Sequence, residues 1–247
     1  MHNFFIDKTN VIGDLVNIDG EHFNHILNVL RMRVGDEFLV TFDQSCHLCQ
    51  IKEIFQTSLT AQITQRDYLD SNLSIDLYLF QGLPKSDKLE LIIQKAVELG
   101  VKEIIPVQMK RSIAKIEQNK VKQKTQRFNA IAQSAAEQSK RTIIPQVLEP
   151  LSFTLALEKA KELDLLLVPY ENQKGILSTK EALSLIKKGD KVGVIIGPEG
   201  GFSPNEIALA EKDGGKLISL GKRILRTETA AITALSMLML HAEMNLD

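Results

Sequence analysis

The helical stretch at residues 231–240 constrains the fold more than any other feature, because it is apolar on nearly every face. A helix without a polar face is buried in a large core, in a membrane or at a subunit interface. Thr233 and Ser236 interrupt the run, and the chain has no stretch of about 20 apolar residues, the length that a membrane span needs. We therefore expect a large core or a second subunit to cover this helix.

A charged loop precedes this helix. A short apolar run at residues 216–220 predicts a strand, and the loop at residues 221–230 then begins with a glycine and carries Arg223, Arg226 and Glu228. Charges concentrated at the entrance of a buried helix indicate a functional site rather than a solvated connection.

A second candidate loop, Gly-Pro-Glu-Gly-Gly-Phe at residues 197–202, directly follows a buried-type strand at residues 191–196. Ser203 and Glu206, with Pro204 after the serine, have the pattern of a capping box and predict the start of a helix. The loop fits neither the P-loop nor the dinucleotide-binding glycine pattern. Taken alone, it is compatible with a tight turn as well as with a ligand-binding loop.

The chain divides into two parts with different patterns. Residues 1–72 are mostly short β runs, typical of a small sandwich or barrel, with one helix at residues 20–30. Beyond them, strands alternate with longer helices, which predicts an α/β fold with a mostly parallel sheet. The expected strands are residues 74–80, 101–107, 163–168, 191–196 and 216–220, and the expected helices are 87–99, capped by Ser86, 126–140 and 179–188.

Three of these strands end near Val168, Ile196 and Leu220, and each leads into a loop of glycine, proline or charge. In open α/β sheets, ligands bind outside the carboxyl ends of the strands. These loops are therefore the expected ligand site.

Composition limits the remaining possibilities. The chain is 44% hydrophobic and 25% charged, as is ordinary for a soluble globular protein, and its start lacks the pattern of a signal peptide, so we expect a cytoplasmic location. Cys46 and Cys49 have the spacing of half a zinc site or a redox pair, but no second pair follows, and we interpret them as incidental strand residues. His22 and His25 lack a third ligand, so no metal site is predicted.

Positive charge is concentrated in one segment. Residues 110–141 hold nine lysines and arginines against two glutamates, whereas residues 1–72 hold five against ten acids. Such an excess is a candidate binding surface for a polyanion, although a solvated lysine-rich helix face has the same composition. Arg31 and Arg33, at the end of the first helix, either complement its dipole or contact phosphate.

The two loops together are more specific than either alone. Residues 197–202 and 220–230 resemble the paired cofactor loops of the SPOUT methyltransferases, in particular those of the 16S ribosomal RNA (uracil-N3)-methyltransferase family. The likeness extends, in order, to Val29, Leu30, Arg31, Gly35 and Asp36, to residues 95–101, and to residues 136–139 with Arg141 and Pro145. It covers nearly the whole chain, although residues 115–127 match no pattern of the family.

The resemblance implies a fold that local patterns do not predict. Residues 73–247 would form a SPOUT α/β domain with a deep trefoil knot, and residues 1–72 a small PUA-like β-barrel that binds RNA. The chain would act as a homodimer. Knots are otherwise nearly absent from proteins, so periodicity and composition alone do not indicate one.

The activity implied is S-adenosylmethionine-dependent methylation of N3 of a specific uridine in 16S ribosomal RNA of the small ribosomal subunit. Two alternatives stay open. One is a SPOUT methyltransferase that acts on another ribosomal or transfer RNA base, and the other is a non-catalytic RNA-binding protein.

Residue roles follow from the resemblance. Arg226 would be catalytic and stabilise negative charge on the uracil carbonyl oxygens, as a pre-placed donor does for an oxyanion. Glu228 would either accept the N3 proton or anchor the loop by pairing with a cation. The implied cofactor-binding residues are Pro169, Tyr170, Ile196, Gly197, Glu199, Gly200, Gly201, Leu220, Gly221, Ile224, Leu225, Arg226, Thr229 and Ala230. The expected RNA-binding residues are His22, His25, Arg31, Arg33, Arg111, Lys140 and Arg141.

Overall fold

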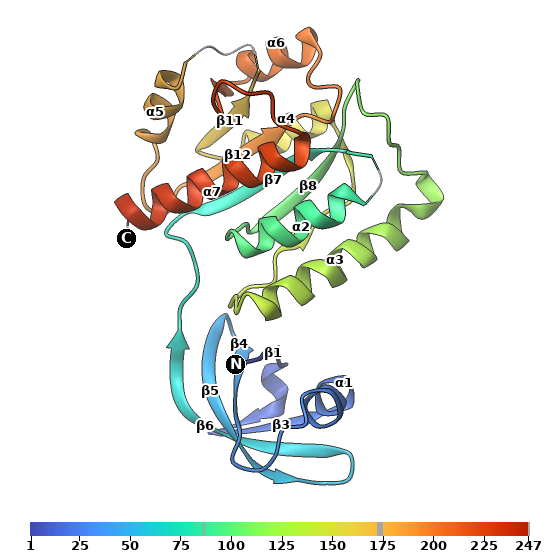
Figure 1. Ribbon diagram of the computed structural model, residues 1–247, viewed down its shortest axis with the longest axis vertical. Coiled ribbons are helices and arrows are strands. Elements are labelled where there is room, and N and C mark those ends of the chain that lie inside the picture. The colour runs from blue at the N-terminus through green and yellow to red at the C-terminus, as the bar shows by residue number, and fades with distance from the viewer. Residues whose placement is uncertain (86, 172–174, 247) are drawn as a thin grey trace. The chain divides into compact units, whose positions relative to one another are not determined.

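The computed structural model describes residues 1–85, 87–171 and 175–246 (Figure 1). The chain forms two compact units, one of Met1–Asn72 with Ala136–Ile143 and the other of Leu73–Ala135 with Ile144–Asp247. Ser86, expected to cap a helix, lies outside the described residues. Each unit has its own sheet.

The first unit is built on a six-stranded sheet with the strand order β1-β4-β5-β6-β3-β2. β1 runs parallel to β4, with Phe4 opposite Val40, and the other neighbouring strands are antiparallel. The β-rich start expected from the short apolar runs is therefore confirmed. The strands are β1 (Asn3–Phe5), β2 (Val11–Ile12), β3 (Leu15–Asp19), β4 (Glu37–Phe42), β5 (Ser45–Ile54) and β6 (Ser58–Leu69), with a short turn η1 (Lys8–Asn10).

One helix packs on this sheet, formed by α1 (Gly20–Asn24) and a wider turn, η2 (His25–Val29). Its apolar face is buried, with Phe23 and Ile26 in the core of the unit. Arg31 ends the helix in the left-handed conformation, at φ +57°, and the amide of Met32 donates a 3.1 Å hydrogen bond to the Ile26 carbonyl. Helices commonly end in this way, which places Arg31 on the surface.

The second unit contains a seven-stranded sheet, ordered β10-β8-β7-β12-β11-β13, with β9 paired to β8. All its strand pairs are parallel, as predicted, and Val194 lies between Leu79 and Leu167 of the two neighbouring strands. The strands are β7 (Asp76–Gly82), β8 (Glu103–Gln108), β9 (Gln146–Val147), β10 (Leu151–Ser152), β11 (Leu165–Pro169), β12 (Lys191–Ile196) and β13 (Lys216–Ile218).

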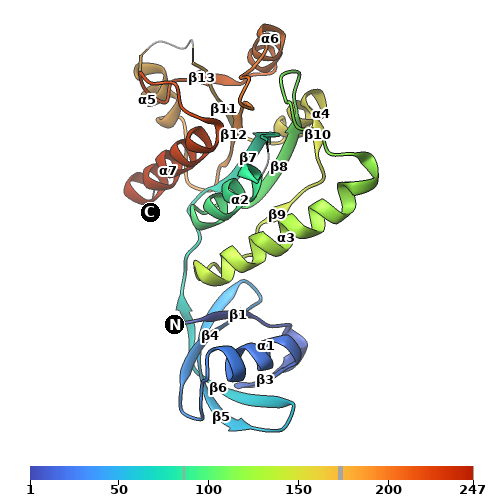
Figure 2. The same cartoon turned by 45° about the vertical axis from the view of Figure 1, so that its right-hand side comes forward.

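Helices cover both faces of this sheet. Phe80 and Ile195 share a core with side chains of α4 and α6, and α2 and α7 lie side by side over the opposite face (Figures 1 and 2). The helices are α2 (Lys88–Glu98), α3 (Val121–Gln138), which follows the turn η3 (Gln118–Lys120), α4 (Phe153–Ala160), α5 (Leu177–Leu183), α6 (Pro204–Lys212) and α7 (Thr227–Asn245).

The capping box at the start of α6 is confirmed, since Ser203 and Glu206 exchange side-chain and backbone hydrogen bonds. Two helix boundaries differ from those expected. α3 begins at Val121, earlier than residue 126, because the lysines and glutamines before it are good helix formers. α5 ends at Leu183, earlier than residue 188, and further along the chain the Asp190 carboxylate accepts the Lys187 amide at 2.8 Å and forms a turn.

Helix α7 begins at Thr227, which corrects the expectation of a loop over residues 221–230. Arg226 is extended, with ψ at 154°, and its carbonyl accepts the first helical hydrogen bond, from Ala230, at 2.8 Å. Glu228 therefore stands in the first turn of the helix and not in a loop.

The second unit covers one side of α7. The buried residues of this helix include Ala231, Ala234, Leu235 and Leu238, and they recur at helical spacing. On the remaining surface, Leu240 and Met244 are 46% and 71% exposed, so part of the apolar surface of α7 is not covered by this unit. No helix in the described part of the chain is long and apolar enough to cross a membrane.

Candidate active site

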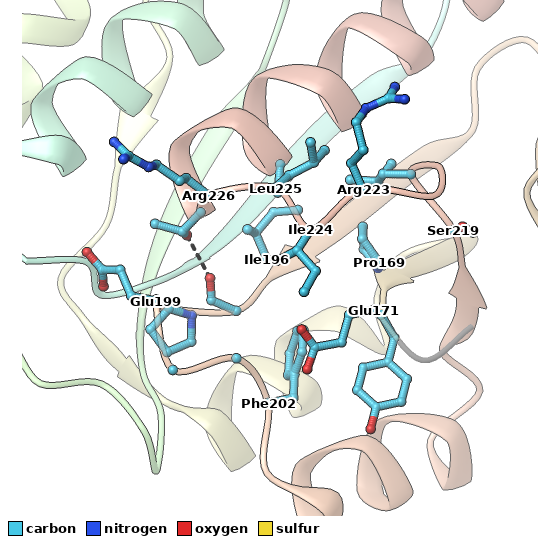
Figure 3. A pocket seen from close by; sticks show the side chains of 18 of the residues that line it. Pro169, Glu171, Ile196, Glu199, Phe202, Ser219, Arg223, Ile224, Leu225 and Arg226 are labelled. Carbon is cyan, nitrogen blue, oxygen red and sulfur yellow. Dashed lines mark hydrogen bonds between the residues drawn. The ribbon is translucent and has the colours of Figure 1, made fainter. Parts of the chain in front are cut away.

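A cavity of about 460 Å³ opens at the carboxyl ends of β11, β12 and β13, where ligands bind in sheets of this type (Figure 3). Three loops line it, and each follows one of these strands. The lining residues are Lys88, Pro169, Tyr170, Glu171, Ile196, Gly197, Pro198, Glu199, Gly200, Gly201, Phe202, Ser219, Leu220, Gly221, Lys222, Arg223, Ile224, Leu225, Arg226, Thr227 and Ala230.

Glycines allow the first loop to turn tightly beside its neighbours. A Cβ on Gly200 would lie 2.9 Å from the Cβ of Arg111, and Gly201 has a φ of +66° that side chains disfavour. The amide of Gly201 donates a 2.9 Å hydrogen bond to the Pro198 carbonyl and closes the turn. The loop is therefore both a tight turn and one wall of the cavity.

A buried hydrogen-bond chain joins this loop to the start of α7. The Thr227 hydroxyl donates to the Gly197 carbonyl at 2.7 Å (Figure 3) and accepts from Nε2 of Gln81 at 2.9 Å. Gln81 is fully buried at the end of β7. The two sequence-predicted loops are thus connected to each other and to the centre of the sheet.

An ion-pair network also joins the loops. Nζ of Lys88 lies 3.2 Å from Oε1 of Glu199 and 3.2 Å from Oε2 of Glu228. The ion pairs with Glu228 and Glu199 raise the pKa of Lys88 and outweigh the opposing effect of burial. Burial raises the pKa of Glu199, but the amide of Lys85, at 3.0 Å, and the Lys88 ammonium outweigh it, so that the net pKa is lowered.

Other polar groups at the cavity point in different directions. In Figure 3 the Glu171 side chain points toward Phe202, and Arg223 and Arg226 point away from each other at the two ends of their loop. Ile224, in the same loop, is 86% exposed. The cavity thus combines backbone groups and apolar walls with two carboxylates, of Glu171 and Glu199, and with the cations of Lys88, Lys222, Arg223 and Arg226.

Nearly all predicted cofactor-binding residues line this cavity. Thr229 does not, because it is exposed in the first turn of α7. Glu228 is not in the cavity wall either, and its side chain is only 16% exposed beside Lys88. The lining residues that the sequence analysis missed are Lys88, Glu171, Pro198, Phe202, Ser219, Lys222, Arg223 and Thr227.

The positions of these residues in the chain explain why some of them were not predicted. Pro198, Phe202 and Thr227 lie inside or beside the quoted loops and could have been included. Lys88 could not have been predicted, because it is more than 100 residues from both loops along the chain and no local sequence pattern connects it with them.

The predicted RNA-binding residues occupy several places. In the first unit, His25, Arg31 and Arg33 are exposed, and the rings of His22 and His25 stand edge-on to Phe4 at 5.5 and 5.8 Å. In the second unit, Arg111 donates from Nη1 to the Gly200 carbonyl at 3.1 Å, next to the cavity.

The end of the basic segment differs from expectation. Arg141 is 5% exposed, and burial lowers its pKa to about 10, so its guanidinium is not on the surface where phosphate would bind. Lys140, beside it, is half-buried and has a φ of +59°. Arg141 is therefore removed from the set of RNA-binding candidates.

The cysteines lie in a strand, as interpreted from the sequence. Cys46 and Cys49 are buried and free in β5, and burial raises the pKa of both thiols, that of Cys49 to about 12. Thiols in this state are poor nucleophiles and poor metal ligands. Among the described residues, no group of three or more His, Cys, Asp or Glu could hold a metal ion.

Comparison with known proteins identifies the family. Residues 71–239 match the RNA methyltransferase domain family, and residues 18–64 match the RNA methyltransferase PUA domain family. The ribosomal RNA small subunit methyltransferase E of Bacillus subtilis is 35% identical over 99% of this chain and 98% of its own length. The protein of the same name from Mesomycoplasma hyopneumoniae is 33% identical over 96% of this chain and 98% of its own length.

Comparison with solved structures leads to the same family. A crystal structure of ribosomal RNA small subunit methyltransferase E from Neisseria gonorrhoeae, bound to S-adenosyl methionine, matches 96% of this chain and 96% of its own, with a TM-score of 0.82 and 29% identity. A crystal structure of a hypothetical protein has a TM-score of 0.89 and 34% identity over 98% of this chain. The resemblance found in the paired loops is confirmed, and the chain belongs to the family of RNA methyltransferases with a PUA domain that the Bacillus subtilis protein represents.

Proposed function

We propose that this protein transfers a methyl group from S-adenosylmethionine to N3 of a specific uridine in 16S ribosomal RNA of the small ribosomal subunit. The observation that carries the proposal is the cavity between two connected glycine loops, at the carboxyl ends of the strands, in a chain that matches small-subunit RNA methyltransferases over its full length. Whole-chain likeness favours this substrate over another ribosomal or transfer RNA base.

The residues of the cavity fit the cofactor. Its volume of about 460 Å³ is within the usual range for small-molecule sites. Ile196, Leu225 and Phe202 offer apolar walls for an adenine, and the loop backbones offer polar groups. The Glu171 carboxylate, which faces the cavity, suits a ligand that carries positive charge. S-adenosylmethionine supplies a methyl group on a sulfonium sulfur when it is bound.

Arg226 is the proposed catalytic residue. Methylation at N3 requires loss of the N3 proton, and negative charge then develops on the neighbouring carbonyl oxygens of the uracil. A guanidinium held at the start of α7 stabilises this charge as a pre-placed donor. The pairing of Glu228 with Lys88 supports the anchor role of this carboxylate over the role of proton acceptor.

RNA binding is assigned to surface cations of both units. In the first, residues 1–72, proposed to form a PUA-like β-barrel RNA-binding domain, Arg31 and Arg33 are exposed beside His25. In the second, residues 73–247, the proposed SPOUT domain, Arg111 lies beside the cofactor loop. Cations that grip phosphates position an RNA, and their contribution decreases with salt. Part of the basic segment is already neutralised, because Arg127 pairs with Glu90 at 2.9 Å.

Three further features belong to the proposal. The segment that forms a deep trefoil knot would be the one after β13, which returns to Gly197 and Gln81 through Thr227. The exposed apolar residues of α7 would be covered in a homodimer. A ribosomal substrate would place the protein in the cytoplasm.

The test is transfer of a labelled methyl group from S-adenosylmethionine to naked 16S RNA, to assembled small subunits and to bulk transfer RNA, with mapping of the modified base. Label at N3 of one small-subunit uridine supports the proposal. Label only in transfer RNA would support S-adenosylmethionine as the cofactor and would contradict 16S ribosomal RNA as the substrate. Cofactor binding without any label would leave a non-catalytic RNA-binding protein.

A further inference from the structure

We propose that Lys88 is a positioning residue, whose ammonium holds the two cofactor loops together through Glu199 and Glu228 and so keeps the cavity in its binding arrangement. The inference rests on the proposed function for its consequences in catalysis. Its structural part concerns only this chain's own residues.

The contacts of Lys88 are specific. It is the first residue of α2, it lines the cavity, and its Nζ lies 3.2 Å from one carboxylate oxygen of Glu199 and 3.2 Å from one of Glu228. Glu199 stands between the glycines of the first loop, and Glu228 in the first turn of α7. A single side chain therefore connects three elements that are distant along the chain.

These ion pairs differ from ordinary surface pairs in their burial. The side chains of Glu228, Glu199 and Lys88 are 16%, 25% and 33% exposed. The pair between Lys95 and Glu98, also on α2, is 41% and 35% exposed and joins neighbouring turns of one helix. A pair that is largely shielded from water is less screened, and removal of one partner leaves a carboxylate without compensation.

Removal of Lys88 has a second consequence. Glu199 and Glu228 share one ammonium, so their oxygens lie no further apart than twice 3.2 Å. Without the cation, two carboxylates at this separation repel each other and would push the loops apart. They would also place uncompensated negative charge at the cavity, where a polyanionic RNA must approach.

Neutral hydrogen bonds do not replace this link. The bond from Thr227 to Gly197 connects the same two segments, but neither residue carries charge. The amide of Lys85 holds Glu199 at 3.0 Å without reaching α7. Lys88 is the cation for which the structure gives contacts with both carboxylates, among the described residues.

The test compares Lys88→Met, which keeps the apolar stem and removes the charge, with Lys88→Arg, which keeps the charge, and with Lys95→Met as a matched control on the same helix. The first readout is hydrogen–deuterium exchange of the ligand-free protein. We expect faster exchange in peptides from both loops in Lys88→Met, and exchange like that of the wild type in the other two variants.

The second readout is S-adenosylmethionine affinity by calorimetry, expected to fall about tenfold or more in Lys88→Met, as for loss of a shielded ion pair. Adding Glu199→Gln and Glu228→Gln to Lys88→Met removes the repulsion, so this triple variant should regain slower loop exchange. A purely steric role for the lysine stem would show no such rescue.

Exchange and affinity of Lys88→Met within twofold of the wild type would overturn the inference. Loss of affinity without any change in loop exchange would also contradict it, because the lysine would then act directly on the ligand. Should the wild type itself bind no S-adenosylmethionine, the proposed function fails, and the exchange experiment still decides the role of Lys88.

Discussion

The Thr227 hydroxyl and the Gly197 carbonyl oxygen are 2.7 Å apart, and this hydrogen bond joins the first residue of α7 to the loop after β12. The Thr227 side chain is buried and also accepts a hydrogen bond from Gln81. The bond thus places the two sequence-predicted loops on opposite sides of one cavity (Figure 3). The activity proposed for this chain depends on that arrangement.

Replacing Thr227 with valine keeps the shape of the side chain and removes the hydroxyl. Gly197 and Gln81 then each lose a hydrogen-bond partner in a buried place, so we expect the free energy of unfolding to fall by about 1–3 kcal/mol. Denaturant unfolding measures this change, and S-adenosylmethionine binding should weaken in parallel. Thr227→Ser retains the hydroxyl, loses only the methyl group and serves as the control, so it should keep both hydrogen bonds. An unchanged free energy of unfolding in Thr227→Val would contradict the prediction.

Replacing Arg226 with alanine tests the catalytic assignment. Arg226 is exposed, so the fold should tolerate the change, with an unaltered melting temperature. Because Arg226 also lines the cavity, cofactor affinity is measured separately, and turnover is compared at saturating S-adenosylmethionine. Turnover should fall by about 100- to 1,000-fold, as when one donor to a developing negative charge is removed. Arg226→Lys keeps the charge and should lose less. Nearly full turnover in the alanine variant would remove Arg226 from the mechanism.

Glu171→Gln tests whether the Glu171 carboxylate at the cavity recognises positive charge on the cofactor. Replacing a charged acceptor with a neutral one weakens a hydrogen bond by about 1 kcal/mol, which corresponds to about a fivefold loss of S-adenosylmethionine affinity. Glu162→Gln, an exposed acid outside the cavity, should bind normally. Unchanged affinity in Glu171→Gln would show that this carboxylate faces solvent in the complex.

The exposed apolar surface of α7 predicts a homodimer. Leu240→Glu combined with Met244→Glu places charge on that surface and should convert a dimer to a monomer, because buried unpaired carboxylates are costly. Sedimentation velocity measures the change. Leu155→Glu, on an exposed position of α4, should leave the assembly as it is. A wild-type monomer at micromolar concentration would contradict the prediction.

Stability should fall at alkaline pH because of Cys49. Burial raises its pKa to about 12 in the folded protein, from a usual value of 9.0. Above pH 9 the unfolded chain loses the thiol proton while the folded chain keeps it, so the free energy of unfolding decreases as pH rises from 9 toward 12. Denaturant unfolding at pH 8 and pH 10 measures the loss. In Cys49→Ala the loss should be smaller, and an equal loss in both proteins would assign it to other groups.

Local signals in the sequence predicted much of the fold. Ser203 and Glu206 lie within one helical turn, so residues close along the chain are enough to predict the start of α6. The run at residues 191–196 coincides with β12, and the glycines after it already indicated where the chain turns beside the cavity. The same reasoning misplaced the start of α7, because Thr227 and Thr229 are weak helix formers, and the first turn of this helix is stabilised by tertiary contacts such as the Thr227 hydrogen bond to Gly197.

The sequence by itself determined most of the longer strands and helices, the β-rich start and the two loops of the candidate site, because periodicity, capping and glycine act between residues close along the chain. It did not predict α4 or the short strands β9 and β10. Only the tertiary structure decided that Arg141 is buried, that Glu228 pairs with Lys88 and that Thr227 bonds Gly197. Burial and ion pairing depend on which side chains folding brings within a few ångströms of one another. No local sequence pattern predicts which of these distant side chains come close together.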